Sequence, residues 1–474
     1  MSRGTTWSLI AYAASQVLRL GSNMILWRLL APEVFGLMAL VYSVLTGLAM
    51  FSDVGIGPSI IQRKEGEDER FINTAWTIQV GRGFVLFLAA AVLAHPIALF
   101  YGDPQLGPVL IAVSAGSILQ GLNSTRLFSE QRQISLGRLT IIDLLMQIGA
   151  VIATVVYAAI SPTIWAVVFG GLVGALIKLV LSHAILPGVR NRIYFDRAHA
   201  RELTSFGRWV FVSTLMTFAA MQSDRLIFGK LISIEALGVY NIGNLWAAIP
   251  QAILGGIFGS VVFPALCRIN QEGGDFSHVY RLMRAPWLML GGWLCCALVV
   301  GGPALIRALY DERAADAEWV VQILACSTWL YTLENANGTA LLARGYPKYV
   351  AAGNASKFVA MLILIPLGFA RYGFVGAVAG YTLTEGFRYV TSVYLLARVG
   401  ISTLSVDLSL MSVAGLAVGI SWLVRDAMRG TFEAWFAGVP RGPWFAEALL
   451  AGVVTGSVWG MRFWWHRKRA GARL

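Results

Sequence analysis

Residues 163–186 read TIWAVVFGGLVGALIKLVLSHAIL, and among Asp, Glu, Lys and Arg the stretch contains only Lys178. A helix of this length crosses the hydrocarbon core of a bilayer, which is roughly 30 Å thick. Lipid offers no hydrogen bonds to the backbone, so only helices and closed barrels span it. The stretch lacks the alternating pattern of a barrel strand. It therefore predicts a transmembrane helix.

Similar apolar runs recur along the whole chain. The protein has 474 residues, of which 57% are hydrophobic and 13% charged, and its mean hydropathy is +0.67. Soluble domains carry about 25% charged residues. The fold class expected is thus an all-α polytopic membrane protein with fourteen spans and short connections. The expected spans are 6–30, 34–60, 74–100, 106–127, 138–160, 163–186, 209–232, 236–265, 286–309, 319–342, 349–370, 374–397, 404–424 and 444–464.

The positive charge is distributed unevenly between the two sets of loops. The net charge is +12. Lys and Arg accumulate in cytoplasmic loops, so the richer set marks that side. The poorer set holds only Arg313, Arg371, Arg425, Arg429 and Arg441. The richer set includes the segments 63–70, 190–208, 268–284 and the basic tail 467–473. We expect both termini to be cytoplasmic. This topology explains the basic excess, so nucleic-acid binding is not expected.

Two passages suggest an internal repeat. The passage from Arg28 to Gly36 aligns with the passage from Lys230 to Gly238 at a shift of 202 residues. Further along, Asn123 to Leu127 resembles Asn337 to Leu341 at a shift of 214 residues. Transporters often consist of repeated bundles with the binding site between them. We predict two six-helix lobes around a central cleft, residues 1–190 and 191–400. Residues 401–474 would form two additional helices and a basic cytoplasmic tail.

Polar residues at membrane depth indicate the expected site. The first span carries a polar stripe at helical spacing, and the seventh span carries a second set. A charged side chain at the bilayer centre is costly, so such a stripe should face a wet cavity or a partner helix. The stripe of the first span comprises Ser8, Tyr12, Ser15, Gln16, Arg19, Ser22 and Asn23. The seventh span carries Ser213, Thr214, Thr217, Asp224 and Arg225.

Further ionisable residues lie within expected spans: Arg82, Asp143, Lys178, Glu334, Lys357, Glu385 and Arg388. Glu385 and Arg388 are three apart on one helix face, where pairing is a structural alternative to a functional role. Lys178 and Asp143 lie toward the cytoplasmic ends of their spans, where a structural role is favoured. Together with Arg19, Asp224 and Arg225 this set has a small cationic excess, which suits an anionic ligand. The substrate-binding residues we predict are Ser15, Arg19, Asn23, Arg82, Asp224, Arg225, Glu334, Lys357, Glu385 and Arg388.

Small residues within the spans indicate close helix packing. Gly170 and Gly174 form one Gly-x-x-x-Gly pair, and Gly255 and Gly259 form another. Such pairs let helices approach closely in lipid. We assign them a packing role and no function.

Sequence motifs of catalysis are missing. No phosphate-binding loop of the Gly-x-x-x-x-Gly-Lys-Ser/Thr type occurs, and the five histidines lack metal-ligand spacing. The four cysteines contain no Cys-x-x-Cys pair and are expected to be buried thiols. A membrane glycosyltransferase is the enzyme alternative, but the expected external loops are short. We expect a protein that is not an enzyme and that has no cofactor or metal.

Several motifs resemble a known family, the polysaccharide flippases of the Wzx type in the MOP exporter superfamily. Its relatives include lipid II flippases and multidrug-extrusion proteins. The motifs are Trp7-Ser8-Leu9, Arg28 to Leu37, Asp53-Val54-Gly55, Ser59 to Gln62, Tyr101 with Pro104 and Leu106, Asp224 to Gly238, and Leu341 to Gly345 with Lys348. The sequence departs from the family in one place. The family has an asparagine two residues before the aspartate that corresponds to Asp224, and here Gln222 or Ser223 could take its role.

The resemblance implies transport of an undecaprenyl-diphosphate-linked oligosaccharide from the cytoplasmic to the periplasmic leaflet, for exopolysaccharide, O-antigen or capsule synthesis. It also implies membrane lipids, a polysaccharide polymerase and chain-length machinery as partners. The diphosphate needs cations, and arginine is the best planar partner for phosphate. Arg19 is the candidate contact; an ion pair with Asp224 or Glu334 is the alternative. A cation-coupled multidrug or small-molecule exporter and a membrane scaffold remain alternative functions.

Overall fold

A computed structural model describes the backbone of residues 2–52, 55–62, 68–132, 136–435, 439 and 441–471. Side chains are described over these ranges except at 2–13, 58, 61–62, 136, 202–216, 433 and 465–471. The chain divides into two compact units, residues 1–218 and 219–474, with the boundary inside one long helix.

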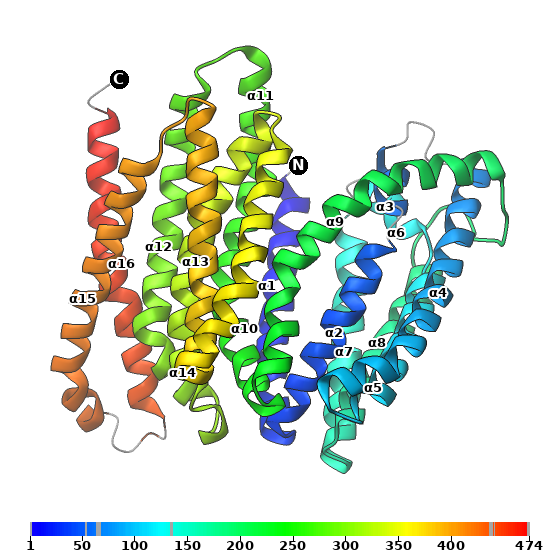
Figure 1. Cartoon of the computed structure of the whole chain (residues 1–474), viewed down its shortest axis with the longest axis horizontal. Coiled ribbons are helices and arrows are strands. Elements are labelled where there is room, and N and C mark those ends of the chain that lie inside the picture. Colours follow the sequence, from blue (N-terminus) through cyan, green and yellow to red (C-terminus); the bar gives the residue numbers. More distant parts are fainter. Residues whose placement is uncertain are drawn as a thin grey trace. The chain divides into compact units, whose positions relative to one another are not determined.

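The N-terminal unit is built from helices, and its longest described connection is the segment 185–196 between α8 and α9 (Figure 1). Helices α4 and α5, α7 and α8, and α1 and α7 pack against each other. The segment α5–α6 is bent by 62° between Leu122 and Arg126. The helices are α1 (Ser2–Leu29), α2 (Pro32–Phe51), α3 (Ile56–Gln62), α4 (Glu69–Tyr101), α5 (Leu106–Leu122), α6 (Arg126–Arg132), α7 (Leu136–Ile160), α8 (Ile164–Ala184) and the first part of α9 (Arg197–Leu231).

In the C-terminal unit, α12 packs against α13, α15 and α16, and α13 also packs against α10 and α14 (Figure 1). Helix α14 is two antiparallel arms, because Tyr372 and Gly373 have non-helical backbone angles; Gly373 has φ = 58°, which suits glycine. After the end of α9 the elements are α10 (Ile234–Ile257), a π-helical turn (Phe258–Val262), α11 (Phe263–Glu272), α12 (Phe276–Leu309), a 3₁₀ turn (Glu312–Ala314), α13 (Ala317–Ala343), α14 (Pro347–Arg398), α15 (Leu404–Trp435) and α16 (Gly442–Gly471).

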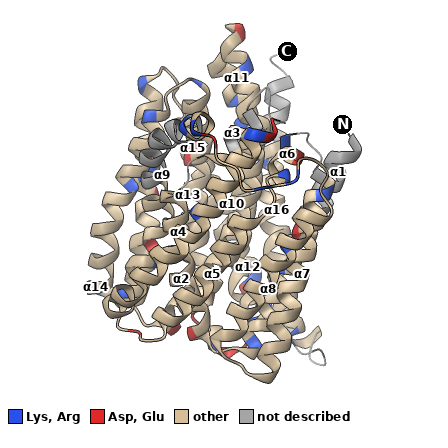
Figure 2. Cartoon of the chain, turned by 90° about the vertical axis from the view of Figure 1, so that its right-hand side faces the viewer, with Lys and Arg blue, Asp and Glu red and all other residues tan. Residues whose placement is uncertain are grey.

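The prediction of an all-helical polytopic membrane protein is confirmed. In the described ranges nine helices are long and apolar enough to cross a membrane, or ten if the bent α5–α6 pair is one span. Both arms of α14 belong to one of these candidates. The helices are free of charge over most of their length (Figure 2). Several boundaries differ from the expectation: α9 and α12 begin at Arg197 and Phe276, ahead of the expected spans 209–232 and 286–309.

The passages aligned as a repeat can be compared locally. In the first pair, α1 ends at Leu29 and α2 begins at Pro32, while α9 ends at Leu231 and α10 begins at Ile234, so both passages have the same helix–turn–helix form. In the second pair the forms differ. Asn123 ends α5, whereas Asn337 lies inside α13.

The two glycine pairs have different surroundings. A Cβ on Gly174 would lie 2.9 Å from Ala150 Cβ on α7, and one on Gly170 would lie 2.7 Å from Ala150 O, so this pair permits close packing of α8 on α7. By contrast, nothing in the described part lies within 4 Å of a Cβ built on Gly255 or Gly259. The packing role predicted for the second pair is therefore wrong in this structure. Gly259 instead lies in the π-helical turn that follows α10.

This difference gives a testable prediction. Gly170→Leu should push α8 away from α7 and destabilise the N-terminal unit by about 1–3 kcal/mol, the usual cost of overpacking. Gly255→Leu is the matched control and should leave the apparent melting temperature of the purified protein almost unchanged. Equal melting temperatures for the two variants would contradict close α7–α8 packing.

Candidate functional site

The two arms of α14 approach each other through glycines. A Cβ on Gly368 would lie 2.7 Å from the carbonyl carbon of Gly376, and one on Gly380 would lie 2.9 Å from that of Leu364. Any residue with a Cβ atom would clash at these positions, so the close approach of the two arms requires glycine. The close approach sets polar residues of one arm beside those of the other, which brings Lys357 within reach of Glu385.

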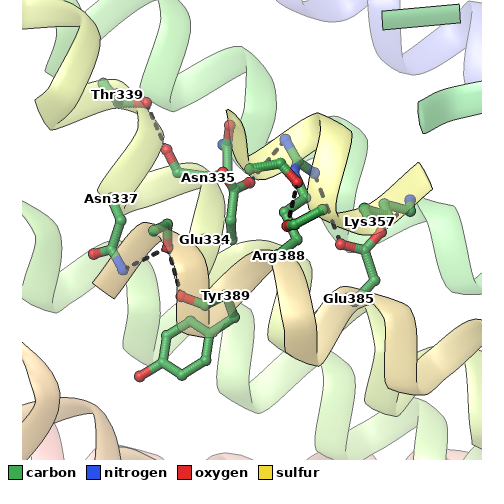
Figure 3. Close-up of polar contacts among 11 residues, drawn as sticks. Glu334, Asn335, Asn337, Thr339, Lys357, Glu385, Arg388 and Tyr389 are labelled. Atoms are coloured by element: carbon green, nitrogen blue, oxygen red, sulfur yellow. Dashed lines mark hydrogen bonds and ion pairs between the residues drawn. The ribbon is translucent and has the colours of Figure 1, made fainter. Parts of the chain in front are cut away.

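Four ionisable side chains on α13 and α14 form one cluster (Figure 3). Lys357 Nζ donates to Glu385 Oε1 at 2.5 Å, between the two arms of α14. Arg388 Nη2 lies 2.9 Å from Glu334 Oε2 on α13, an ion pair rather than an aligned hydrogen bond. Arg388 Nη1 is also 3.7 Å from Glu385 Oε2. We call these residues the α13–α14 charge cluster.

The α13–α14 charge cluster is buried and electrically balanced. Side-chain exposure is 6% for Lys357, 3% for Glu385, 2% for Glu334 and 13% for Arg388. Two cations face two anions, so the small cationic excess expected from the sequence does not reside here. The ring of Tyr381 lies 5.1 Å from Lys357 Nζ, which adds a cation–π contact. Glu385 and Arg388 do contact each other along their helix, but the shorter bond of Glu385 is to Lys357 on the other arm.

Asp224 and Arg225 lie on the part of α9 that belongs to the C-terminal unit. Asp224 is 4% exposed and accepts a hydrogen bond of 2.8 Å from Tyr240 Oη on α10. Its Oδ1 atom has no hydrogen-bond donor among the described side chains. Arg225 Nη1 donates to Gln222 Oε1 at 2.8 Å. Gln222, the residue considered as a substitute for the family's asparagine, is thus engaged with Arg225.

Arg82 lies in the N-terminal unit and lines a cavity of about 760 Å³ formed by α2 to α8. Its Nε donates to Ser52 Oγ at 2.9 Å and its Nη2 to the Ala49 carbonyl at 2.6 Å. Carbonyls in the last turn of a helix have no partner within that helix. Arg82 therefore caps the end of α2 and at the same time gives the cavity a cationic wall.

The same cavity contains a second charged pair. Lys178 Nζ donates to Asp143 Oδ1 at 2.8 Å between α8 and α7, and both side chains are partly exposed. Gln79 Nε2 donates to the carbonyls of Gly121 and Asn123, at 2.9 and 3.0 Å, where α5 ends. The cavity thus has a mixed lining, in which a paired cation and anion and Arg82 are set among apolar side chains such as Leu86 and Phe128.

The polar stripe of the first span lies on α1. Ser15 Oγ donates to Gln147 Oε1 on α7 at 2.8 Å, so this part of the stripe meets a partner helix. Arg19 is exposed, and its guanidinium has no hydrogen-bond or ion-pair partner among the described side chains; Asn23 is half-buried. Ser8, Tyr12, Ser213 and Thr214 lie outside the described side chains.

One buried pair was not expected from the sequence. Arg284 on α12 is 2% exposed and its Nη2 donates to Asp407 Oδ1 on α15 at 2.5 Å; Asp407 is fully buried and also accepts from Tyr389 Oη at 3.0 Å. Arg284 was assigned to a cytoplasmic loop, which is wrong because α12 begins at Phe276. Asp275 caps that helix by accepting from His278 N, a start signal that the sequence does contain.

Hydrogen bonds beside this pair link α12, α13 and α14. Tyr280 Oη on α12 donates to Asn337 Oδ1 on α13 at 2.9 Å. Asn337 Nδ2 donates to Ser392 Oγ on α14 at 3.2 Å, and Ser392 Oγ donates to the Tyr389 carbonyl at 2.8 Å (Figure 3). These bonds satisfy the buried amide of Asn337, which lies within α13. In the described ranges no group of three or more His, Cys, Asp or Glu residues could hold a metal ion.

Comparison with solved structures places this geometry in a known fold. The lipid II flippase MurJ in an inward closed conformation superposes with a TM-score of 0.74 at 12% identity, covering 96% of this chain and 98% of MurJ. A multidrug resistance MATE family transporter of the MOP superfamily, inward-facing, gives a TM-score of 0.56 at 13% identity, covering 85% and 99%.

Sequence comparison finds relatives in polysaccharide biosynthesis. The chain is 22% identical to the lipopolysaccharide biosynthesis protein WzxC of Escherichia coli K12, over 83% of this chain and 80% of WzxC. It is 25% identical to the succinoglycan biosynthesis transport protein ExoT of Rhizobium meliloti, over 70% of this chain and 67% of ExoT.

Fold and relatives define the class as a multi-pass membrane transporter rather than an enzyme. The model of the polysaccharide biosynthesis protein family matches residues 25–317, more than half of the chain. The chain therefore belongs to the polysaccharide biosynthesis protein family. Its fold is the one shared by MurJ and the MATE transporter of the MOP superfamily.

Proposed function

We propose that this protein flips an undecaprenyl-diphosphate-linked oligosaccharide from the cytoplasmic to the periplasmic leaflet of a bacterial inner membrane. The product would serve exopolysaccharide, O-antigen or capsule synthesis. Membership of the polysaccharide biosynthesis family and the names of WzxC and ExoT support transport in such a pathway. Membrane lipids, a polysaccharide polymerase and chain-length machinery are the partners that this function would require.

The architecture that we propose for this function has fourteen spans. Residues 1–190 and 191–400 would form two six-helix lobes around a central cleft, and residues 401–474 two additional helices. Spans containing Arg19 and Asp224 would line the cleft, and both termini would be cytoplasmic. A wet cleft would accept the sugar and diphosphate while the lipid tail stays in the bilayer.

One observation carries the choice of ligand: Arg19 is exposed and has no carboxylate partner among the described side chains. Glu334, one of its two alternative partners, is already paired with Arg388. A free guanidinium suits a diphosphate, because its planar fork matches phosphate oxygens. An exporter of cationic drugs would instead need available acids. Glu334 and Glu385 are both neutralised by cations, which leaves Asp224, bonded to Tyr240, as the buried acid without a bonded cation among these candidates.

Substitution of Arg19 tests the proposal. Arg19→Ala should express normally but fail to restore surface polysaccharide in a strain lacking its own flippase, because the diphosphate loses a charge-assisted contact worth about 1.5–3 kcal/mol. Arg19→Lys should keep part of the activity, since the charge survives without the bidentate fork. The readout is surface polysaccharide together with lipid-linked oligosaccharide retained in the inner leaflet.

Arg371→Ala is the matched control, because it removes an exposed arginine from a loop that we expect on the periplasmic side of the membrane. This variant should complement fully. Full complementation by Arg19→Ala would remove Arg19 from the mechanism. If Arg19→Ala instead lowers the folded yield and a second substitution, Asp224→Asn, restores transport, the ion-pair alternative is correct.

A further inference from the structure

The C-terminal unit contains a second cavity that the proposed transport function does not use. It has a volume of about 370 Å³ and lies between α12, α15 and α16. Its basic lining residues are His278, Arg281, Arg284 and Arg462, and no acidic residue lines it in the described part of the chain. We call it the α12–α15 pocket.

Arg284 is the buried cation of the α12–α15 pocket. One of its nitrogens, Nη2, is bonded to Asp407, but Nε and Nη1 have no hydrogen-bond partner among the described residues. A buried donor without an acceptor is costly, so most such groups in proteins have a partner. Because Arg284 lines the pocket, an anion bound there could accept these two hydrogen bonds.

The charge around the pocket is positive. Asp407 is the acid that faces Arg284, and it offsets one cation only. Arg281 is exposed, with its Nε bonded to the Ser277 carbonyl, and Arg462 donates from Nη2 to Ser409 Oγ on α15 at 2.9 Å. Arg281 and Arg462 therefore add positive charges to the lining of the pocket, which attract anions.

The other wall of the pocket is apolar and open. Leu282 is 45% exposed and Val406 is 40% exposed, and Met289 and Leu410 continue the wall inward. A small soluble anion would gain no binding energy from contact with an apolar wall. A phospholipid has both features, since its phosphate carries the charge and its acyl chains pack on apolar side chains.

We propose that the α12–α15 pocket binds the phosphate group of an anionic membrane phospholipid, with Arg284 as the buried ligand and Arg281 and Arg462 as the outer ones. The bound lipid would join α12, α15 and α16 at the ends that we expect to face the cytoplasm. Anionic lipids attract basic residues on that side of a membrane. This inference does not depend on the transported substrate.

Lipid binding to the purified full-length protein tests the proposal. Native mass spectrometry would compare binding of phosphatidylglycerol and of zwitterionic phosphatidylethanolamine. We expect tighter binding of phosphatidylglycerol, and a loss of about tenfold or more in Arg281→Gln/Arg462→Gln, the usual effect of removing hydrogen bonds from a charged group. Arg281→Gln alone, at an exposed position that does not threaten folding, should show part of this loss.

The matched control is Arg268→Gln/Arg398→Gln, which removes the same charge from exposed positions of the same unit, outside the pocket. It should bind phosphatidylglycerol as the unchanged protein does. Equal affinity of the pocket variants and the unchanged protein, or an equal loss in the control, would overturn the proposal. Displacement of phosphatidylglycerol by inorganic phosphate would overturn the lipid source and assign the pocket to a soluble phosphate instead.

Discussion

Lys357→Met should destabilise the C-terminal unit by about 3–5 kcal/mol, the cost of leaving one member of a buried ion pair without its partner. Glu385 would lose its 2.5 Å bond and keep only Arg388 at 3.7 Å, which is already paired with Glu334. The apparent melting temperature of the purified protein should fall, and transport should be lost.

A double substitution separates stability from function in this pair. Lys357→Met/Glu385→Leu removes both charges and should restore the melting temperature, because apolar pairs of similar volume replace buried ion pairs at little or no cost. If the α13–α14 charge cluster takes part in transport, the double variant should still fail to restore surface polysaccharide. A double variant that both folds and transports normally would make the pair purely structural.

The control for the single substitution is an ion pair at the surface. Arg268 and Glu272 are 2.7 Å apart, with side chains 79% and 59% exposed. Such pairs contribute about 0–1 kcal/mol. Arg268→Met should therefore leave the melting temperature nearly unchanged, and a fall as large as that of Lys357→Met would contradict the role of burial.

Asp407→Asn should have an effect of the same size. Arg284 would remain buried without a carboxylate, at an expected cost of about 3–5 kcal/mol. Because Asp407 also accepts from Tyr389, the substitution weakens the attachment of α15 to both α12 and α14. A lower melting temperature and faster proteolysis in the connection at residues 399–403 would report this loss.

Asp426→Asn, at an exposed position of the same helix, is the control and should change neither readout. Arg284→Met/Asp407→Leu removes both buried charges and should recover the melting temperature. If Asp407→Asn melts like the unchanged protein, the Arg284–Asp407 pair does not hold α15 in place.

Helix existence could be predicted well, because it depends on composition within a short window. The apolar runs mark the helices, and the stretch at 163–186 corresponds to α8 (Ile164–Ala184). The break between the arms of α14 was expected between 370 and 374, where Tyr372 and Gly373 leave the helical region. Helix starts were less accurate, because polar segments such as 276–285 continue a helix beyond its apolar part.

Candidate residues could be selected from the sequence, since a charge within an apolar run is conspicuous. Glu334, Lys357, Glu385 and Arg388 were chosen in this way. The contact between Glu385 and Arg388 could be anticipated from their spacing along one helix face. The shorter contacts, which join different helices or arms, could not be predicted. Lys357 and Glu385 are 28 residues apart, and they meet because glycines let the two arms of α14 approach.

The sequence by itself determined that this protein is a helical membrane transporter of the polysaccharide biosynthesis family, since hydrophobic length and local motifs are properties of the chain alone. Only the tertiary structure decided which buried charges neutralise one another. Arg284 and Asp407 are 123 residues apart, and neither lies in a motif. Their pairing depends on how α12 and α15 are rotated and packed, and burial then makes each charge require the other.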